Sequence, residues 1–545
     1  MWNKKFGNEK SFCKYIAGVS SDKDVASKFS EFFENIYNAP NVLKDKFAVD
    51  FSKEFPNYQS SSNIKSNLTV ELVDNIVANM KRGKAAGADN LTCEHLLFAH
   101  PIVTMAISLL FNCMITIGHV PNPFGVGIII PVPKGDKRTH DQLDDYRGIT
   151  INCVLSKVFE HCLLELCFDL FKCSERQFGF KKGVGCQHAI WSVRKIIDKF
   201  SKNDSTVNLC SLDLSKAFDR IDYNALFIKL MKRNFPRFFI EILVNWFNKS
   251  FGMVRWKNEV SKCVKINSGV KQGGILSPFL FNIFVDDVIA TLAKSKKGCF
   301  FNFMCVNAIM YADDLILLSI SVSDLQHLVN LCVIEFKLIG LEINAKKSSC
   351  IRIGNRFTTK ACPIILNGVE MPWKQELEYL GVCIVSAKRF TLNWQKNKHK
   401  FFRALNGIFC KVGTQSSVAV TSNLIESCCT PILMYASECI NWNSSSLKIM
   451  DNAYNQIYHK IFKSFDNNVI ASCQFFLGQL PFELKMICRK FNFMQKLKKS
   501  DNCTIRFLCH GDMDNSGLCD KFKISDDSNS VHEAVWDYFK ERVFM

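Results

Sequence analysis

The sequence lacks the features that mark a secreted chain. No two of its 25 cysteines are spaced as C-x-x-C, and the N-terminus MWNKKFGNEK has no apolar signal core. Scattered cysteines without a signal peptide favour a reducing compartment, so we expect a nuclear or cytoplasmic protein and not a secreted one. Most of these thiols are expected to be buried as small hydrophobic side chains.

Long uncharged runs are also scarce, and only residues 102–120 come close to the length of a membrane span without any Asp, Glu, Lys or Arg. Within this run, polar side chains recur every four residues, at Thr104, Ser108, Asn112 and Thr116. Such a stripe follows one face of a helix. We therefore expect a mostly buried helix and no membrane partner.

Acidic residues are too few to balance the basic ones. Lys and Arg number 69 against 51 Asp and Glu, which gives a formal net charge of +18. A basic surplus of this size favours a polyanionic partner, such as nucleic acid or an anionic membrane, although a composition that only aids solubility is the simpler explanation. The 545 residues, of which 48% are hydrophobic, are enough for three or four units with their own cores.

The order of the segments predicts an α+β fold. Residues 1–64 look like a helical lead-in followed by a polar linker, and helices alternate with short apolar runs over residues 65–205. Apolar strands flanked by helices fill 206–385, helices dominate 386–470, and a mixed extension over 471–545 ends in the helical pattern VHEAVWDYFKERVF.

Two segments place acidic residues at the ends of apolar runs. VNLCSLDLSKAFDRIDY predicts a strand over 207–214 with Asp213 near its end, and IMYADDLILL predicts a strand, a tight turn at Asp313-Asp314 and a second strand. Paired carboxylates between apolar arms are costly unless a cation is present, and Mg²⁺ prefers such oxygen ligands. For either segment alone, an ordinary turn pair or a helix cap would explain the residues equally well, and Asp222 is expected to cap the helix that follows it.

Nine blocks occur in a fixed order between about residue 65 and residue 385: GKAAGADN, IIIPVPKGD, YRGIT, FGFKKG, LDLSKAFD, SGVKQGGILSP, YADD, GLEINAKKS and EYLGV. Together they resemble the reverse transcriptase of non-LTR (LINE-like) retrotransposons of the jockey and CR1 type. The resemblance implies a right-hand polymerase with fingers and part of the palm in 65–205, an antiparallel palm sheet in 206–385, a helical thumb in 386–470 and a C-terminal extension.

The same resemblance implies an RNA-directed DNA polymerase with an RNA template, a DNA primer or target, and dNTPs. Asp213, Asp313 and Asp314 would hold two Mg²⁺ ions, for which Mn²⁺ can substitute. Two ions about 4 Å apart can clamp the attacking and leaving oxygens of an in-line phosphoryl transfer.

The nucleotide would meet a further set of residues. Phe218, five residues after Asp213, is expected to be a steric gate under the sugar, although a core Phe is the simpler explanation among 47 Phe. Ser277 is expected to cap the next helix, with Pro278 at its first position. The remaining candidates for nucleotide binding are Gln272, Gly273, Arg147, Lys134 and Lys347, the last of which has Lys346 as an equally basic neighbour.

The strongest positional signal for nucleic acid is the start of the predicted thumb. No Asp or Glu occurs from residue 379 to residue 425, where basic and aromatic residues alternate. The residues expected to bind nucleic acid are Lys388, Arg389, Lys396, Lys398, Lys400 and Arg403, together with Lys181 and Lys182 of the FGFKKG block.

Other functions share parts of this pattern. A group II intron maturase or an RNA-dependent RNA polymerase would have the same hand-shaped fold, although Phe218 argues against an RNA product. A catalytically silent RNA-binding remnant would have the same basic surface, yet all three acidic residues are retained. The sequence therefore favours the polymerase.

Overall fold

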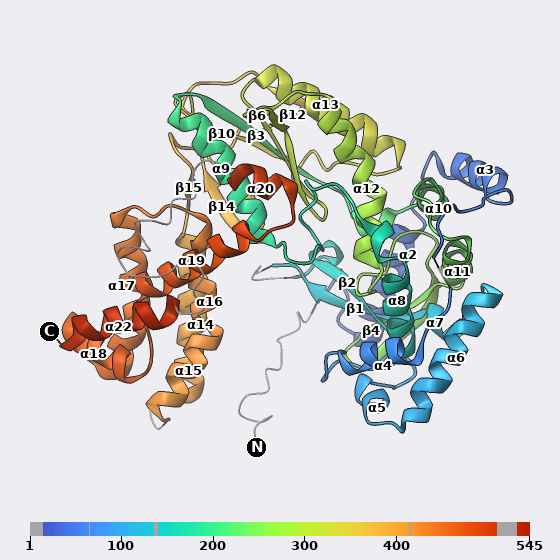
Figure 1. Cartoon of the computed structure of the whole chain (residues 1–545), viewed down its shortest axis with the longest axis horizontal. Helices are drawn as coiled ribbons and strands as arrows, with labels where there is room; N and C mark the ends of the chain where they lie inside the picture. The colour runs from blue at the N-terminus through green and yellow to red at the C-terminus, as the bar shows by residue number, and fades with distance from the viewer. Residues whose placement is uncertain (1–14, 65, 136–139, 414–415, 510–530, 545) are drawn as a thin grey trace.

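The computed structural model describes residues 15–64, 66–135, 140–413, 416–509 and 531–544. Helices of the C-terminal third lie on one side, helices and a sheet from the first half lie on the other, and a second sheet joins them (Figure 1). The predicted α+β class is confirmed. Parts of the predicted lead-in (1–14) and of the C-terminal extension (510–530 and 545) lie outside the described residues.

The joining sheet has four strands, and every neighbouring pair is antiparallel, as predicted. Their order is β10 (Ser349–Gly354), β3 (Thr206–Asp213), β9 (Asp314–Ser319) and β8 (Ala308–Tyr311). Alternate side chains fill two cores, because successive residues of a strand point to opposite faces. Leu212 and Leu317 pack into the core that includes α12 (Ser277–Lys294) and α13 (Val322–Leu338), while Leu209 and Ile316 pack toward α9 (Cys186–Lys202).

A second sheet combines strands from distant parts of the chain. Its order is β2 (Tyr146–Asn152), β1 (Val126–Pro133), β4 (Phe251–Trp256) and β5 (Glu259–Lys265), with β1 and β4 parallel. Helix α2 (Asp22–Tyr37) covers this sheet, and its fully buried Phe29 contacts the rings of Tyr146 and Trp256. Strands β4 and β5, which follow β3 in the sequence, therefore share a sheet with β1 and β2, which precede it.

The remaining helices of this half pack around the two sheets. They are α3 (Lys44–Glu54), α4 (Val70–Ala78), α5 (Cys93–Leu97), α6 (Pro101–Ile117), α7 (Asn122–Gly125), α8 (Val154–Leu166), α10 (Tyr223–Lys232) and α11 (Arg237–Asn248). The Asp222 side chain accepts a hydrogen bond from Ala225 N at 3.0 Å, so its predicted role as the cap of α10 is confirmed.

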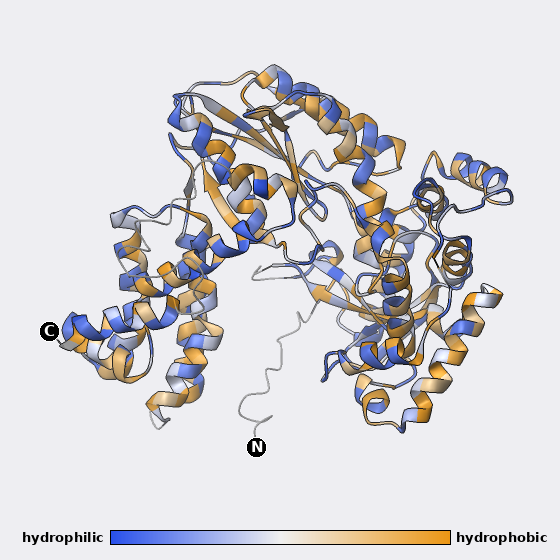
Figure 2. Ribbon diagram, viewed as in Figure 1, coloured by the Kyte–Doolittle hydropathy of each residue, from blue (hydrophilic) through white to orange (hydrophobic). Residues whose placement is uncertain are grey.

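Helix α6 is not mostly buried, contrary to the expectation. Most of its polar stripe faces inward, where Ser108 Oγ and Asn112 Nδ2 donate to the Leu68 carbonyl at 3.0 and 2.8 Å, whereas Thr116 at its end is exposed. The opposite face is apolar and exposed at Ile102, Met105, Leu109, Leu110 and Ile117, as Figure 2 shows along this helix. None of the helices in the described ranges has both the length and the hydropathy needed to cross a bilayer.

The C-terminal third is helical, as predicted for 386–470, whereas the extension that was expected to be mixed is also helical in its described residues. It contains α14 (Gln395–Val412), α15 (Val418–Cys428), α16 (Thr430–Leu433), α17 (Ser444–Phe462), α18 (Asn467–Phe476), α19 (Phe482–Lys498), α20 (Cys503–Cys509) and α22 (Val531–Phe544). Phe401, Tyr454, Phe482 and Val535 share one core, so α19 and α22 pack with the helices that begin near residue 395. A three-stranded sheet, β13 (Glu376–Tyr379), β14 (Val382–Val385) and β15 (Thr391–Leu392), leads into it. The cysteines that the structure describes are all free, and more than half are buried.

Candidate active site

The three predicted acidic residues meet at one end of the joining sheet. Asp213 is the last residue of β3 and pairs directly with Asp314, the first residue of β9. Asp313 precedes it in the two-residue turn from β8, where Tyr311 pairs with Asp314. Directly opposed residues of antiparallel strands have Cβ atoms about 5 Å apart and lie on the same face. Carboxylates 100 residues apart in the sequence are therefore neighbours.

The electrostatics of this cluster favour a cation. Burial raises the pKa of Asp213 and of Asp313. The pKa of Asp314 is raised to about 6, first by burial and then by the charges of Asp313 and Asp213. Like charges in a partly buried site disfavour ionisation of one another, and a divalent ion relieves that repulsion.

A divalent metal fits the chemistry of these donors. Carboxylate oxygens are the hard ligands that Mg²⁺ prefers, usually one or two carboxylates together with substrate phosphates. Within the described ranges, no group of three or more His, Cys, Asp or Glu side chains is arranged so that it could hold a metal ion by itself. The cluster thus supplies part of a ligand set, which substrate phosphates would have to complete.

Basic residues surround the carboxylates. Lys347 Nζ lies 3.9 Å from Asp213 Oδ2, and Arg147, which is exposed on β2, lowers the pKa of Asp313 and Asp314 by its charge. The pKa of Lys134 is itself lowered, first by burial and then by the charge of Lys347. The structure therefore brings all three predicted basic residues to the site.

The segment that carries Lys347 is fixed to the end of β3. Asn344 N donates to the Asp213 carbonyl at 2.8 Å, and Asp213 N donates to Ser348 Oγ at 3.2 Å. This docking distinguishes Lys347, which faces Asp213, from the exposed Lys346, for which the structure gives no contact with the carboxylates.

The Phe218 ring is held in place by neighbouring aromatic rings. It stacks on the fully buried Phe281, with ring centroids 4.3 Å apart and planes inclined by 14°, and it meets the edge of Phe180 at 6.1 Å. Phe218 is half-buried, so one part of the ring belongs to the core and the rest remains accessible. This arrangement suits a rigid steric gate.

The loop 268–276 is bound to the segment that follows β3. Gln272 Nε2 donates to both carboxylate oxygens of Asp219 at 3.0 Å, and Gln272 O accepts from Thr150 N at 2.7 Å. The Gln272 amide is thus bonded within the protein. A Cβ on Gly273, whose φ is +123°, would lie 2.5 Å from the Thr150 carbonyl, so only glycine allows this close approach.

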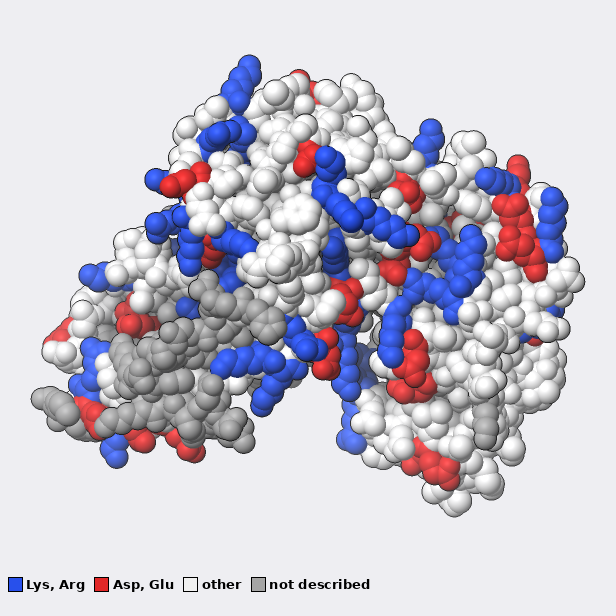
Figure 3. All heavy atoms as spheres, turned by 45° about the horizontal axis from the view of Figure 1, so that its top comes forward, with Lys and Arg blue, Asp and Glu red and all other residues white. Residues whose placement is uncertain are grey.

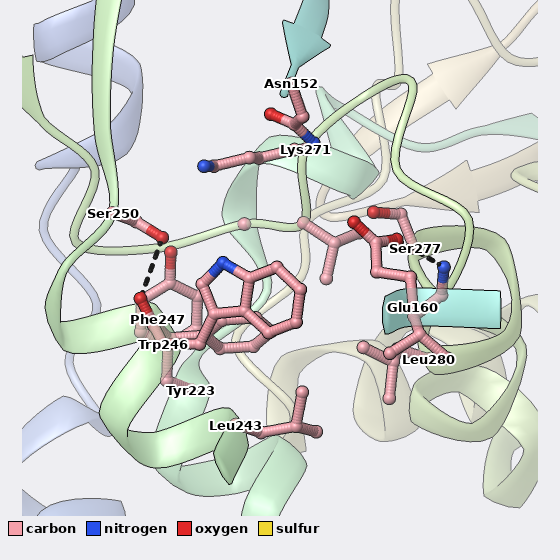
Figure 4. A pocket seen from close by; sticks show the side chains of 13 residues that line it. Asn152, Glu160, Tyr223, Leu243, Trp246, Phe247, Ser250, Lys271, Ser277 and Leu280 are labelled. Atoms are coloured by element: carbon pink, nitrogen blue, oxygen red, sulfur yellow. Dashed lines mark hydrogen bonds between the residues drawn. The ribbon is translucent and has the colours of Figure 1, made fainter. Parts of the chain in front are cut away.

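Behind this loop lies a small cavity of about 40 Å³, lined by Asn152, Glu160, Trp246 and Lys271 among others (Figure 4). Burial raises the pKa of Glu160 and lowers that of Lys271 to about 8. The volume has room for a water molecule, and Asn152 Oδ1 is buried without a hydrogen-bond partner among the described residues. This cavity is structural, and its lining includes none of the predicted catalytic residues.

Glu160 also explains why the predicted cap of α12 is wrong. Its carboxylate accepts from Leu276 N at 2.8 Å, and Leu276 occupies the N-cap position. Ser277 is therefore the first helical residue and makes no capping bond, while Pro278 follows it. The buried carboxylate, which is distant in the sequence, takes the place of a local cap.

The predicted nucleic-acid-binding residues have different environments. Lys181 is largely buried, and its ammonium donates to the Cys173 and Ser174 carbonyls at 3.0 and 2.8 Å, whereas Lys182 is exposed. Lys398 is half-buried, and Lys396 pairs with Glu378 Oε2 at 3.0 Å. The other predicted thumb cations are exposed at Lys388, Arg389, Lys400 and Arg403.

The surface of the molecule shows where the basic side chains gather. Lys and Arg side chains lie on both sides of the hollow in the middle of the molecule (Figure 3). In the C-terminal third, Phe401 is fully buried and Trp394 stacks on Trp442 at 4.8 Å, so these aromatic residues belong to the core of that third.

Sequence reasoning missed two residues beside the site, Lys216 and Gln177, and treated a third, Asp219, only as a weaker acidic candidate. Lys216 lies 3.1 Å from Asp144 and contacts the Phe32 ring, Asp219 binds Gln272, and Gln177 contacts the turn that carries Asp313. Lys216 and Asp219 belong to the LDLSKAFD block, so their proximity to Asp213 in the sequence was an available signal. Gln177 directly precedes the FGFKKG block, but nothing local indicated its partner.

Comparison with known proteins agrees with this geometry. The family described as "Reverse transcriptase (RNA-dependent DNA polymerase)" matches residues 132–384, a range that contains the acidic cluster and the basic residues around it. The acidic cluster therefore lies in the part of the chain that is similar to reverse transcriptases.

The similar curated proteins come from transposons and other mobile genetic elements. The chain is 23% identical over 390 residues to the probable RNA-directed DNA polymerase from transposon BS of Drosophila melanogaster, covering 68% of this chain and 41% of the relative. It is 27% identical over 330 residues to the RNA-directed DNA polymerase from mobile element jockey of the same species, covering 58% and 35%. It is 26% identical over 297 residues to the Pol polyprotein of the type-2 retrotransposable element R2DM, covering 52% and 27%.

Residues 132–384 are thus similar to reverse transcriptases, and the similar proteins come from transposons and retrotransposable elements. The chain spans less than half the length of these curated relatives. A solved structure of apo telomerase from Candida tropicalis overlaps 81% of this chain and 74% of that chain, with a TM-score of 0.40 and 13% identity.

Proposed function

We propose that this chain is an RNA-directed DNA polymerase that extends a DNA 3′ end on an RNA template. In this reaction the 3′-oxygen attacks the α-phosphorus of a dNTP, and the bond to the departing pyrophosphate breaks. The observation that carries the proposal is the pairing of Asp213 with Asp314, beside Asp313 and within a ring of basic side chains.

Asp213, Asp313 and Asp314 would hold two Mg²⁺ ions, with Mn²⁺ as a substitute. When bound, such ions lower the pKa of the attacking hydroxyl and neutralise charge on the leaving oxygen. The rise in the pKa of Asp314 to about 6 supports a role for these carboxylates as ligands, since a cation would restore their ionised form.

The surrounding residues would orient the nucleotide. Arg147 and Lys134 are placed to bind the triphosphate, and the planar fork of Arg suits phosphate oxygens. Lys347, whose Nζ lies 3.9 Å from Asp213 Oδ2, would be placed to protonate the departing pyrophosphate. Phe218, fixed on Phe281, would leave no room for a 2′-hydroxyl. The backbone of Gln272 and Gly273 would form one wall of the nucleotide-binding site.

Nucleic acid would lie in the hollow between the two halves. The segments 65–205, 206–385 and 386–470 would act as fingers, palm and thumb, with β4 and β5 added to the fingers sheet. The exposed Lys388 and Arg389 and the helix α14 would neutralise phosphates of the template and primer. We expect a chromosomal DNA end to serve as primer, in the nucleus or cytoplasm.

Primer extension on poly(rA)/oligo(dT) tests the proposal. The purified, folded chain should incorporate dTTP with Mg²⁺ or Mn²⁺, and Asp313→Asn should reduce incorporation to background. Asp287→Asn is a matched control, because Asp287 is exposed on α12 and pairs with Lys229 away from the cluster. If the wild type shows no incorporation with either ion, or if Asp313→Asn keeps full activity, the proposal is wrong.

A further inference from the structure

We propose that Gln177 is a positioning residue, which fixes the turn that carries Asp313 and thereby sets the geometry of the metal ligands. The effect on catalysis rests on the proposed function. The effect on the turn itself rests only on the contacts of Gln177 and can be measured without any activity.

The Gln177 side chain satisfies both backbone polar groups of Ala312. Its Oε1 accepts from Ala312 N at 3.0 Å, and its Nε2 donates to Ala312 O at 3.3 Å. The same Oε1 also accepts from Gly179 N at 2.9 Å. Gln177 is fully buried, so the carboxamide is held in one orientation by three hydrogen bonds.

Ala312 needs this support because of its conformation. Its φ is +55°, in the left-handed region that residues with a Cβ rarely adopt, and only 7% of its surface is exposed. A buried N–H and a buried carbonyl without partners are strongly unfavourable. Without the Gln177 amide, the peptide between Ala312 and Asp313 would be free to rotate toward other partners, and the Asp313 carboxylate would move with it.

The backbone on both sides of Gln177 forms hydrogen bonds with β8, the first strand of the hairpin that carries Asp313. Phe178 N donates to Met310 O at 2.7 Å, and Met310 N donates to Arg176 O at 2.9 Å. A Cβ on Gly179 would lie 2.4 Å from Ala312 N, so glycine is required for this approach. The segment 176–179 therefore forms an additional edge on β8 that locates the carboxamide.

The residues that follow Gln177 also contact the region where the nucleotide is proposed to bind. Phe180 contacts the ring of Phe218 at 6.1 Å, and Asn282 Nδ2 of α12 donates to Gly179 O at 3.0 Å. One short stretch thus links the ligand turn to the predicted steric gate. Since Mg²⁺ demands a nearly ideal octahedron, whereas Mn²⁺ tolerates more distortion, displacement of Asp313 should affect the two ions unequally.

The test compares Gln177→Met with the wild type. Met keeps the length of the side chain and removes the amide. The matched control is Gln474→Met in α18, because Gln474 is 2% exposed and its amide donates to Asn455 Oδ1 at 3.0 Å, far from the carboxylates in the sequence and in a different core. Both variants lose a buried glutamine, but only the first loses contact with Ala312.

Two readouts separate positioning from general destabilisation. Hydrogen exchange should be faster in peptides covering residues 308–316 of Gln177→Met and unchanged there in Gln474→Met. In primer extension, Gln177→Met should lower kcat with Mg²⁺ by about 100-fold, the scale of a misplacement of about 1 Å. It should lower kcat much less with Mn²⁺ and leave the KM for dTTP within about twofold. Gln474→Met should keep the wild-type ratio of Mg²⁺ to Mn²⁺ activity.

The proposal is overturned if Gln177→Met leaves both the exchange of 308–316 and the ratio of the two metal activities unchanged. If Gln177→Met does not fold, Gln177→Glu at pH 9 decides the question, since the ionised carboxylate keeps the acceptor for Ala312 N but cannot donate to Ala312 O. We then expect protection of residues 308–316 between that of the wild type and complete loss, and full wild-type protection would contradict the proposal. An inactive wild type would refute the proposed function alone, because the exchange measurement remains valid.

Discussion

Replacing Gln272 with Met should make the stability of this protein more sensitive to pH, because Gln272 is the hydrogen-bond donor to the Asp219 carboxylate. Both oxygens of Asp219 accept from Gln272 Nε2 at 3.0 Å. Burial nevertheless raises the pKa of Asp219 from 3.8 to about 6, and the hydrogen bonds from Gln272 are the largest influence that lowers it. Their removal should therefore raise the pKa further.

The magnitude follows from linkage. Since one pKa unit corresponds to about 1.4 kcal/mol, the rise of about two units costs the folded wild type about 3 kcal/mol when Asp219 is ionised. A raised folded-state pKa gives stability that is fully present below the unfolded value of 3.8 and is lost as the pH rises through about 6. Hydrogen bonds to a charged group contribute about 2 kcal/mol, so Gln272→Met should raise the Asp219 pKa further above its wild-type value.

Thermal unfolding in metal-free buffer measures this effect. At pH 8.5, where Asp219 is ionised in both proteins, the Tm of Gln272→Met should lie clearly below that of the wild type. At pH 5.5 the Asp219 carboxyl is mostly protonated in both folded proteins, so the gap in Tm between the variant and the wild type should be smaller. The Asp219→Asn background provides the control, since the pH-dependent part of the gap should vanish there. A gap of equal size at both pH values, or one that keeps its pH dependence in Asp219→Asn, would refute this reasoning.

Two further predictions concern the nucleotide. Phe218→Val should raise rNTP incorporation relative to dNTP in competition assays, because the smaller side chain leaves room for a 2′-hydroxyl, and an unchanged ratio would remove Phe218 from this role. Lys347→Ala should lower the rate of single-nucleotide addition by about 100-fold or more through loss of the general acid, whereas Lys346→Ala should have little effect. Equal losses in the two variants would show that the 3.9 Å approach of Lys347 to Asp213 has no catalytic meaning.

The sequence by itself determined the local elements and the identity of the acidic residues. The cap at Asp222 and the final helix were predicted, because each depends on the periodicity or the capping preferences of adjacent residues. The strand predicted over 207–214 spans 206–213, and the predicted hairpin turns at Ala312-Asp313, one residue earlier than expected, so that Asp314 begins β9. The ordered blocks also indicated that the distant acidic residues belong to one site, and the register of β3 with β9 places them side by side.

Only the tertiary structure decided which partner each polar group finds. Strands β4 and β5 join β1 and β2 across more than 100 residues, Glu160 replaces the expected Ser277 cap, and the stripe on α6 turns inward to bind Leu68. The contact of Gln177 with Ala312, 135 residues away, belongs to the same class. Such partners are set by the need to satisfy buried donors and acceptors wherever the fold brings them, and that need leaves no periodic signal in the chain.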